Sequence, residues 1–96
     1  MRMLLKVTFP TELANHALKD GSFHRVMEAT MDLIKPEAAY FVANNGRRCA
    51  MLFFDMQDAS DIPAIAEPLF STLNAEIELQ PVMNRDDLKK GLGAVA

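Results

Sequence analysis

Three charged side chains offer most of the chemistry in this sequence: Lys6 near its start, and Glu76 and Glu78 near its end. Each lies in a segment whose apolar and polar side chains alternate, which is the pattern of a β-strand. If these two strands are antiparallel neighbours, Lys6 faces one of the glutamates and forms a cross-strand ion pair. The alternative is acid–base chemistry, in which partial burial raises the pKa of a carboxyl group that then moves a proton on a bound ring or enol.

Two further side chains, Tyr40 and Cys49, are candidates for contacting a small molecule beside these charges. Cys49 is the only cysteine and has no internal disulfide partner. We interpret it as a packed apolar residue rather than a nucleophile. Because the sequence has no Cys/His cluster with zinc spacing, neither a metal nor a cofactor is predicted.

Composition limits the size of the fold and the kinds of partner. The 96 residues, of which 50% are hydrophobic and 24% charged, predict one globular domain over 1–96 with a modest core. A net charge of −3 gives no strong positive field, so nucleic acid is not an expected partner. The first apolar run stops at Lys6, which is too short for a signal peptide or a membrane span. We therefore expect no membrane partner and a cytoplasmic location.

The first half of the chain predicts a strand followed by a long helical region. Residues 2–9 alternate between two faces, and Pro10 ends this strand. Apolar residues then recur at helical spacing over 11–34, and Pro36 closes the region. Gly21 lies within it, so either the helix stops and resumes there or one long helix bends.

The middle of the chain predicts a β-hairpin. Two apolar, β-rich segments, Ala38–Asn44 and Arg47–Asp55, flank Asn45-Gly46, the dipeptide favoured in a type I′ turn. A two-residue turn fixes the register of the two strands. The predicted pairs are Asn44 with Arg47, Val42 with Cys49, Tyr40 with Met51 and Ala38 with Phe53.

The last part of the chain predicts a helix, a strand and a second, shorter helix. The first of these helices starts at Ser60, and residues 75–83 alternate as an edge strand does. Residues 84–96 are predicted to form a short C-terminal helix and a tail. Gly91 and Gly93 are expected to end that helix and leave the tail loose.

The order strand, helix, strand, strand, helix, strand is typical of a ferredoxin-like βαββαβ domain, an α+β fold. It places two helices on one face of a four-stranded antiparallel sheet and leaves the other face bare. Both faces of the hairpin are largely apolar, so its orientation is open. If the face with the more polar tip is bare, the helix-free face holds Leu4, Val42, Met51, Phe53 and part of Tyr40. An apolar patch of this kind marks an interface, so we predict a homodimer through this face.

Several short strings spread along the chain resemble the dimeric α+β barrel superfamily. They are Leu5-Lys6-Val7-Thr8, Phe54-Asp55, Pro68-Leu69-Phe70 and Ile77-Glu78-Leu79. The sequence is similar to the muconolactone isomerase branch and to uncharacterised small bacterial proteins of the superfamily. The isomerase branch carries a segment with histidine and arginine before its second strand, where this chain has Lys35-Pro36-Glu37-Ala38-Ala39. We therefore carry over no catalytic residue.

The resemblance implies a dimeric α+β barrel whose two sheets enclose a pocket for a small organic molecule. The side chains expected to line it are Lys6, Thr8, Tyr40, Cys49, Glu76, Glu78 and Gln80, among the apolar Leu4, Met51 and Phe53. A few polar groups in an apolar setting are typical of small-molecule sites. The expected function is binding of a small, partly apolar metabolite between the sheets. The alternatives are a cofactor-independent enzyme, isomerase or monooxygenase-like, acting on an aromatic-derived molecule, and a purely structural or regulatory dimer.

Overall fold

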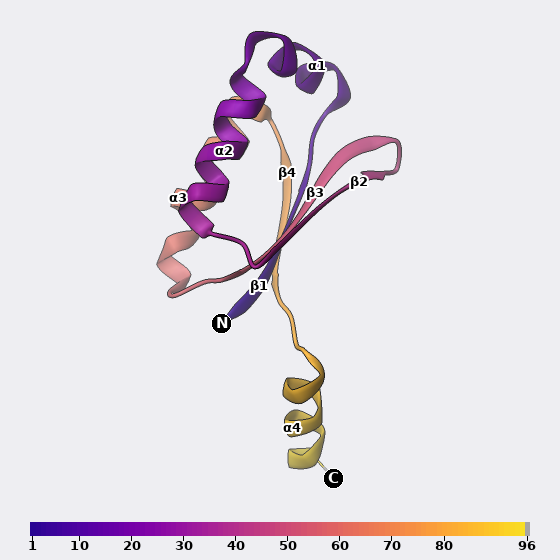
Figure 1. The fold of residues 1–96 in the computed structure, drawn as a ribbon, viewed down its shortest axis with the longest axis vertical. Coiled ribbons are helices and arrows are strands. Elements are labelled where there is room, and N and C mark those ends of the chain that lie inside the picture. The colour runs from indigo at the N-terminus through magenta and orange to yellow at the C-terminus, as the bar shows by residue number, and fades with distance from the viewer. Residues whose placement is uncertain (96) are drawn as a thin grey trace.

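A four-stranded antiparallel sheet forms one layer of the protein, and three helices form a second layer on one face of it (Figure 1). The computed structural model describes residues 1–95 and shows an α+β fold. The elements are β1 (Arg2–Thr8), α1 (Thr11–Asp20), α2 (Ser22–Ile34), β2 (Ala38–Asn44), β3 (Arg47–Asp55), the 3₁₀ turn η1 (Ala59–Asp61), α3 (Ile62–Leu73), β4 (Glu76–Pro81) and α4 (Arg85–Val95). The strand order β2-β3-β1-β4 puts β2 and β4 at the edges.

The first helical region is two helices, so the element order is longer than the predicted βαββαβ. Gly21 has φ 85°, a left-handed conformation that ends α1 and that a residue with a side chain seldom adopts. The backbone N–H of Ser22 donates to the carboxylate of Asp20 at 2.8 Å across this break. The chain therefore stops and resumes its helix at Gly21, which decides between the two predicted alternatives.

The hairpin has the predicted turn and register. Asn45 and Gly46 both have positive φ, 54° and 77°, as a type I′ turn requires. Asn44 lies opposite Arg47, and the three predicted pairs that follow along the hairpin are also present. Local turn chemistry thus determines which side chains share a face of the sheet.

The core lies between the helices and one face of the sheet. Leu5 and Val7 of β1 and Leu52 of β3 are completely buried, as is Leu69 of α3. In β1 these residues alternate with Leu4, Lys6 and Thr8, which therefore lie on the opposite face. The sequence predicted this alternation. Of the two faces that the alternation creates, the helices cover the more apolar one.

The C-terminal segment differs from the prediction. Helix α4 continues through Gly91 and Gly93 to Val95, although glycine was expected to end it. Its start is capped by two reciprocal bonds: Asn84 N–H donates to Asp87 at 3.0 Å, and Asp87 N–H donates to Asn84 at 2.8 Å. Each glycine costs about 1 kcal/mol of helix stability, which weakens a capped helix without breaking it. Residue 96, the end of the predicted tail, lies outside the described residues.

The 3₁₀ turn η1, which leads directly into α3, starts at a reciprocal capping box. The side chain of Asp58 accepts hydrogen bonds from the backbone and hydroxyl of Ser60, and the carboxylate of Asp61 accepts from Asp58 N–H at 3.2 Å. The hydrogen bonds from Ser60 hold the pKa of Asp58 below its ordinary value. The turn that leads into α3 is therefore stabilised by an ionised carboxylate.

We expect Asp58→Ala to lower the melting temperature at pH 7 by removing this cap. Since the native pKa of Asp58 lies below its unfolded value, its contribution is fully present above about pH 4 and is lost as the pH falls through the native pKa. The difference in melting temperature between wild type and Asp58→Ala should therefore shrink below pH 4. Thermal unfolding from pH 7 to pH 2.5 measures it, and a difference that stays constant would contradict the role of the carboxylate.

Candidate functional site

The helix-free face of the sheet is a regular array of side chains in three rows. Each row crosses the strands in the order β4, β1, β3, β2. The rows are Glu76-Thr8-Cys49-Val42, Glu78-Lys6-Met51-Tyr40 and Gln80-Leu4-Phe53-Ala38. The intervening Ala50, Leu52 and Phe54 are buried on the helix side. The hairpin therefore has the predicted orientation, with its polar-tipped face uncovered by α1, α2 and α3.

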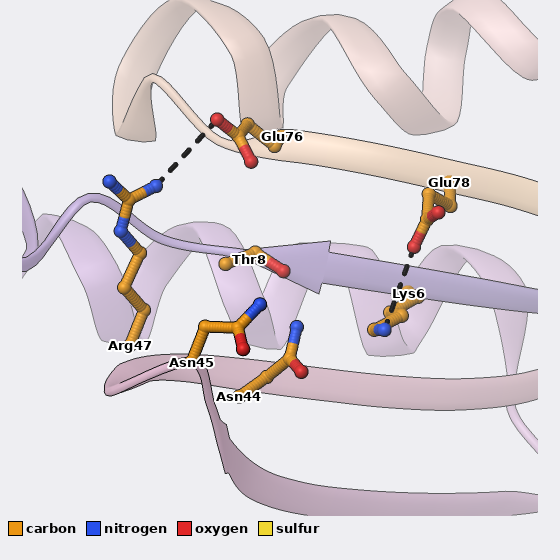
Figure 2. A pocket seen from close by; sticks show the side chains of 7 residues that line it. All are labelled: Lys6, Thr8, Asn44, Asn45, Arg47, Glu76 and Glu78. Atoms are coloured by element: carbon orange, nitrogen blue, oxygen red, sulfur yellow. Dashed lines mark ion pairs between the residues drawn. The ribbon is translucent and has the colours of Figure 1, made fainter.

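A polar hollow of about 610 Å³ lies at one end of this face, where the hairpin turn comes near the start of β4. Its lining consists of Lys6, Thr8, Asn44, Asn45, Arg47, Glu76 and Glu78. Figure 2 shows these side chains converging from β4, from β1 and from the hairpin. We call this set the polar hollow.

Two ion pairs cross the polar hollow (Figure 2). Lys6 Nζ lies 3.7 Å from Glu78 Oε2, and Arg47 Nη1 lies 3.7 Å from Glu76 Oε1. The predicted cross-strand pair of Lys6 is therefore present, with Glu78 as its partner. The side chains of Glu76 and Glu78 are 76% and 71% exposed, so water screens both pairs. A bound molecule can displace such contacts at little cost.

The two asparagines supply neutral hydrogen-bonding groups between the charges. Asn44 ends β2, and Asn45 is the first residue of the turn. A side-chain amide has two N–H donors and a carbonyl acceptor, so it can bind either a hydroxyl or a carbonyl group. Together with Thr8 they give the polar hollow donors and acceptors of several kinds.

Comparison with known proteins does not assign this site. No family model, curated protein or solved structure matches the chain. Within residues 1–95 no three metal-ligating side chains come together, and none of the helices there has the length and apolar character needed to cross a membrane. A function for the site therefore has to be argued from its own side chains.

The predicted site residues do not all reach the polar hollow. Lys6, Glu76 and Glu78 line it, whereas Tyr40 and Cys49 do not. Tyr40 is 61% exposed on the edge strand β2, with its ring 6.4 Å from that of Phe53. Tyr40 thus belongs to an apolar half of the helix-free face, adjacent to the polar half.

Cys49 occupies a different position from the other predicted residues. Only 2% of it is exposed, and its sulfur accepts a weak contact from the hydroxyl of Thr8 at 3.7 Å. A buried thiol of this kind packs as a small apolar group. Cys49 therefore supports the floor of the face and does not present its sulfur to solvent.

Arg47, Asn44 and Asn45 were not among the predicted site residues. A signal for two of them was present, since the predicted hairpin register already placed Asn44 opposite Arg47 on the face with Tyr40 and Cys49. The position of Asn45 in the turn gave no such signal.

We expect the Lys6–Glu78 pair to contribute little to folding. A double-mutant cycle of Lys6→Met, Glu78→Gln and the double variant should give a coupling energy of about 1 kcal/mol or less, because the side chain of Glu78 is 71% exposed and solvent screens the pair. The coupling should fall towards zero in 1 M salt, where the Debye length is about 3 Å. Urea unfolding measures all four proteins, and a coupling well above 1 kcal/mol would show that the pair is structural.

Proposed function

We propose that this chain binds a small amphipathic metabolite on its helix-free face, within a homodimer whose two sheets face each other as in a ferredoxin-like dimeric α+β barrel. The strand order β2-β3-β1-β4, with helical connections on one face, supports the ferredoxin-like arrangement. The division of α1 from α2 at Gly21 and the addition of α4 extend that pattern without changing the order of the strands.

The dimer is supported by apolar side chains that the chain's own helices leave uncovered. Tyr40 and Val42 are 61% and 44% exposed, and Met51 and Phe53 are partly exposed beside them. Helix α4 projects away from the sheet, so it does not cover this face (Figure 1). A contiguous apolar patch on a small protein is a common feature of an interface. A second copy of the same face offers the matching surface for a two-fold dimer.

The observation that carries the binding proposal is that a polar hollow and an apolar half share one face. The middle row runs from Glu78 and Lys6 to Met51 and Tyr40, with adjacent strands about 4.8 Å apart. A molecule lying along this row places its polar groups against Lys6 and the asparagines and its apolar body against Met51. Small-molecule sites have this combination of a few polar anchors and an apolar wall.

Binding is favoured over catalysis by the position of the carboxylates. Glu76 and Glu78 are each paired with a cation, and in the single chain more than two thirds of each side chain is exposed. Carboxyl groups that act as general acids are usually desolvated by their surroundings. Carboxylates that are already paired with cations at the edge of the face are better suited to recognising a polar group of the ligand.

Native mass spectrometry of freshly purified protein tests this proposal, because one spectrum reports both subunit number and any retained molecule. We expect a dimer with an added mass that is lost on denaturation. Lys6→Met should lower the bound fraction, while Lys19→Met, a matched change on the exposed end of α1, should leave it unchanged. A dimer without any added mass would contradict ligand binding, and a monomer would contradict the sheet-face dimer as well.

A further inference from the structure

Helix α4 carries an apolar stripe that its own chain leaves exposed. Leu88, Leu92 and Val95 follow the spacing i, i+4, i+7, and their exposed fractions are 46%, 56% and 81%. No residue within Arg85–Val95 is buried. An isolated helix of this length is marginal in water, and its two glycines weaken it further. The stripe has the spacing by which helices dock into grooves, so α4 needs a surface to pack on.

The base of α4 is attached to the helix-free side of the sheet. Val82 N–H donates to the carbonyl of Arg2 at 3.1 Å, and Arg2 Nη1 lies 3.3 Å from Asp87 Oδ2. Arg2 precedes Met3, which is buried against the helices, so the side chain of Arg2 lies on the helix-free side. From this base α4 points away from the rest of the chain (Figure 1).

An apolar groove of about 200 Å³ lies at the same end of the molecule but on the helix side of the sheet. It is formed where α2 ends and α3 begins, and Leu33, Ile34, Phe54, Met56 and Ile65 line it with Asp61 on its rim. Leu33 is 55% exposed. We call it the α2–α3 groove. Because α4 starts from the opposite side of the sheet, the groove is poorly placed for the helix of its own chain.

The charges of the two surfaces are complementary. Asp61 and Asp55 both line the α2–α3 groove, and Asp55 also pairs with the N-terminal ammonium of Met1 at 2.6 Å. On α4, Lys89 lies beside the apolar stripe and forms no ion pair with any other residue of the described chain. A cation beside an apolar stripe thus matches an apolar groove that has carboxylates in its lining.

We propose that α4 is an exchanged arm, whose apolar stripe packs into the α2–α3 groove of a second copy of this chain. This inference rests on the proposed sheet-face dimer. When two sheets face each other about a two-fold axis that runs along the strands, their equivalent ends lie together and the β4 edge of one copy lies beside the β2 edge of the other. Strand β2 begins shortly after Ile34 of the groove. The arm therefore leaves β4 at the end of the second copy where its groove lies, beside the β2 edge of that copy.

The arm is long enough for this exchange. The facing sheet is about 10 Å away, and its helices lie about as far again beyond it. Eleven helical residues span about 16 Å. The connection Val82–Asn84 adds up to about 10 Å. The two-fold axis also places the second copy's arm in this chain's groove, so the contact occurs twice and closes the dimer.

Disulfide trapping between two different chains tests the exchange. Both chains carry Cys49→Ala; one adds Leu92→Cys on the arm, and the other, with an affinity tag, adds Leu33→Cys in the groove. Both new sites are exposed, so the fold should tolerate them. After the two chains are unfolded, refolded together and mildly oxidised, we expect a covalent heterodimer. Lys90→Cys, on the opposite side of α4, is the matched control and should give at least several-fold less product.

The outcomes distinguish a failure of the exchanged-arm proposal from a failure of the proposed sheet-face dimer. Equal yields from Leu92→Cys and Lys90→Cys would overturn the exchange. So would an internal disulfide in a single chain with both Leu33→Cys and Leu92→Cys, because it would place the arm in its own groove. Sedimentation of the same reduced samples reports association without the disulfide. A dimer without the cross-link overturns only the arm, whereas a monomer overturns the arm and the proposed dimer together.

Discussion

Met51→Asp should turn the proposed dimer into a monomer and leave the fold intact. Met51 lies in the middle row of the helix-free face, between Lys6 and Tyr40, at the centre of the contact that two facing sheets would make. Two-fold symmetry would bury the new carboxylate twice, and taking each carboxylate out of water costs several kcal/mol, which a cation beside it repays only in part. Since each 1.4 kcal/mol is a factor of ten, the dissociation constant should rise by more than about 100-fold. Sedimentation equilibrium over a range of protein concentrations measures this change.

Leu18→Asp is the matched control for this prediction. It also replaces an apolar side chain by aspartate, but Leu18 lies on α1 and is 47% exposed on the helix side of the molecule. The control should keep the association of the wild type, and both variants should keep its circular dichroism spectrum. If Met51→Asp remained dimeric, or if both variants dissociated equally, the sheet faces would not form the interface.

The parts of the fold that the sequence predicted are those set by local rules. The Asn45-Gly46 turn determines the hairpin register, because both residues must adopt positive φ. The alternation in β1 determines which side chains meet the helices, because a strand repeats every two residues. These two rules fix which side chains share a face but left open which face of the hairpin is bare, and the structure shows that it is the face with the more polar tip.

The ends of helices were harder to predict, because glycine has more than one effect. Gly21 has a left-handed conformation and separates two helices, whereas Gly91 and Gly93 lie inside α4. The sequence at residue 21 left the two outcomes open, and at residues 91 and 93 it predicted the wrong one. The cap formed by Asn84 and Asp87 stabilises the helix there. Helix propensities do not include this contribution, so they do not show that a capped helix tolerates glycine.

The polar hollow was predicted in part, because some of its contacts depend on where the chain leaves the sheet. The Lys6–Glu78 pair follows from the pairing of neighbouring strands. The contact of Arg47 with Glu76 joins strands that are not neighbours, since β1 lies between β3 and β4. Strand β1 ends at Thr8, so no residue of β1 lies between Arg47 and β4. Only the three-dimensional path of the chain shows this opening.

Leu52→Ala should have the largest effect on stability, although Leu52 is the next residue after Met51. Its side chain is completely buried between the sheet and the helices, opposite Leu5 in the register. Truncating a buried leucine leaves a cavity and costs about 2–5 kcal/mol, against a total stability of about 5–15 kcal/mol for a typical domain. Urea unfolding at one fixed protein concentration measures the loss, since association also contributes to the stability of a dimer.

The contrast between these neighbours tests the separation of the two faces directly. Leu18→Ala, at a half-exposed site, should cost about 0.5 kcal/mol or less. Leu52→Ala should lower the stability of the fold and keep the two-fold contact under native conditions. Met51→Asp should abolish the two-fold contact and leave the fold intact. A shift of one residue in the strand exchanges the two faces, so these opposite effects are expected only if the register of β3 is correct. A loss below 1 kcal/mol for Leu52→Ala would mean that β3 presents its other face to the helices.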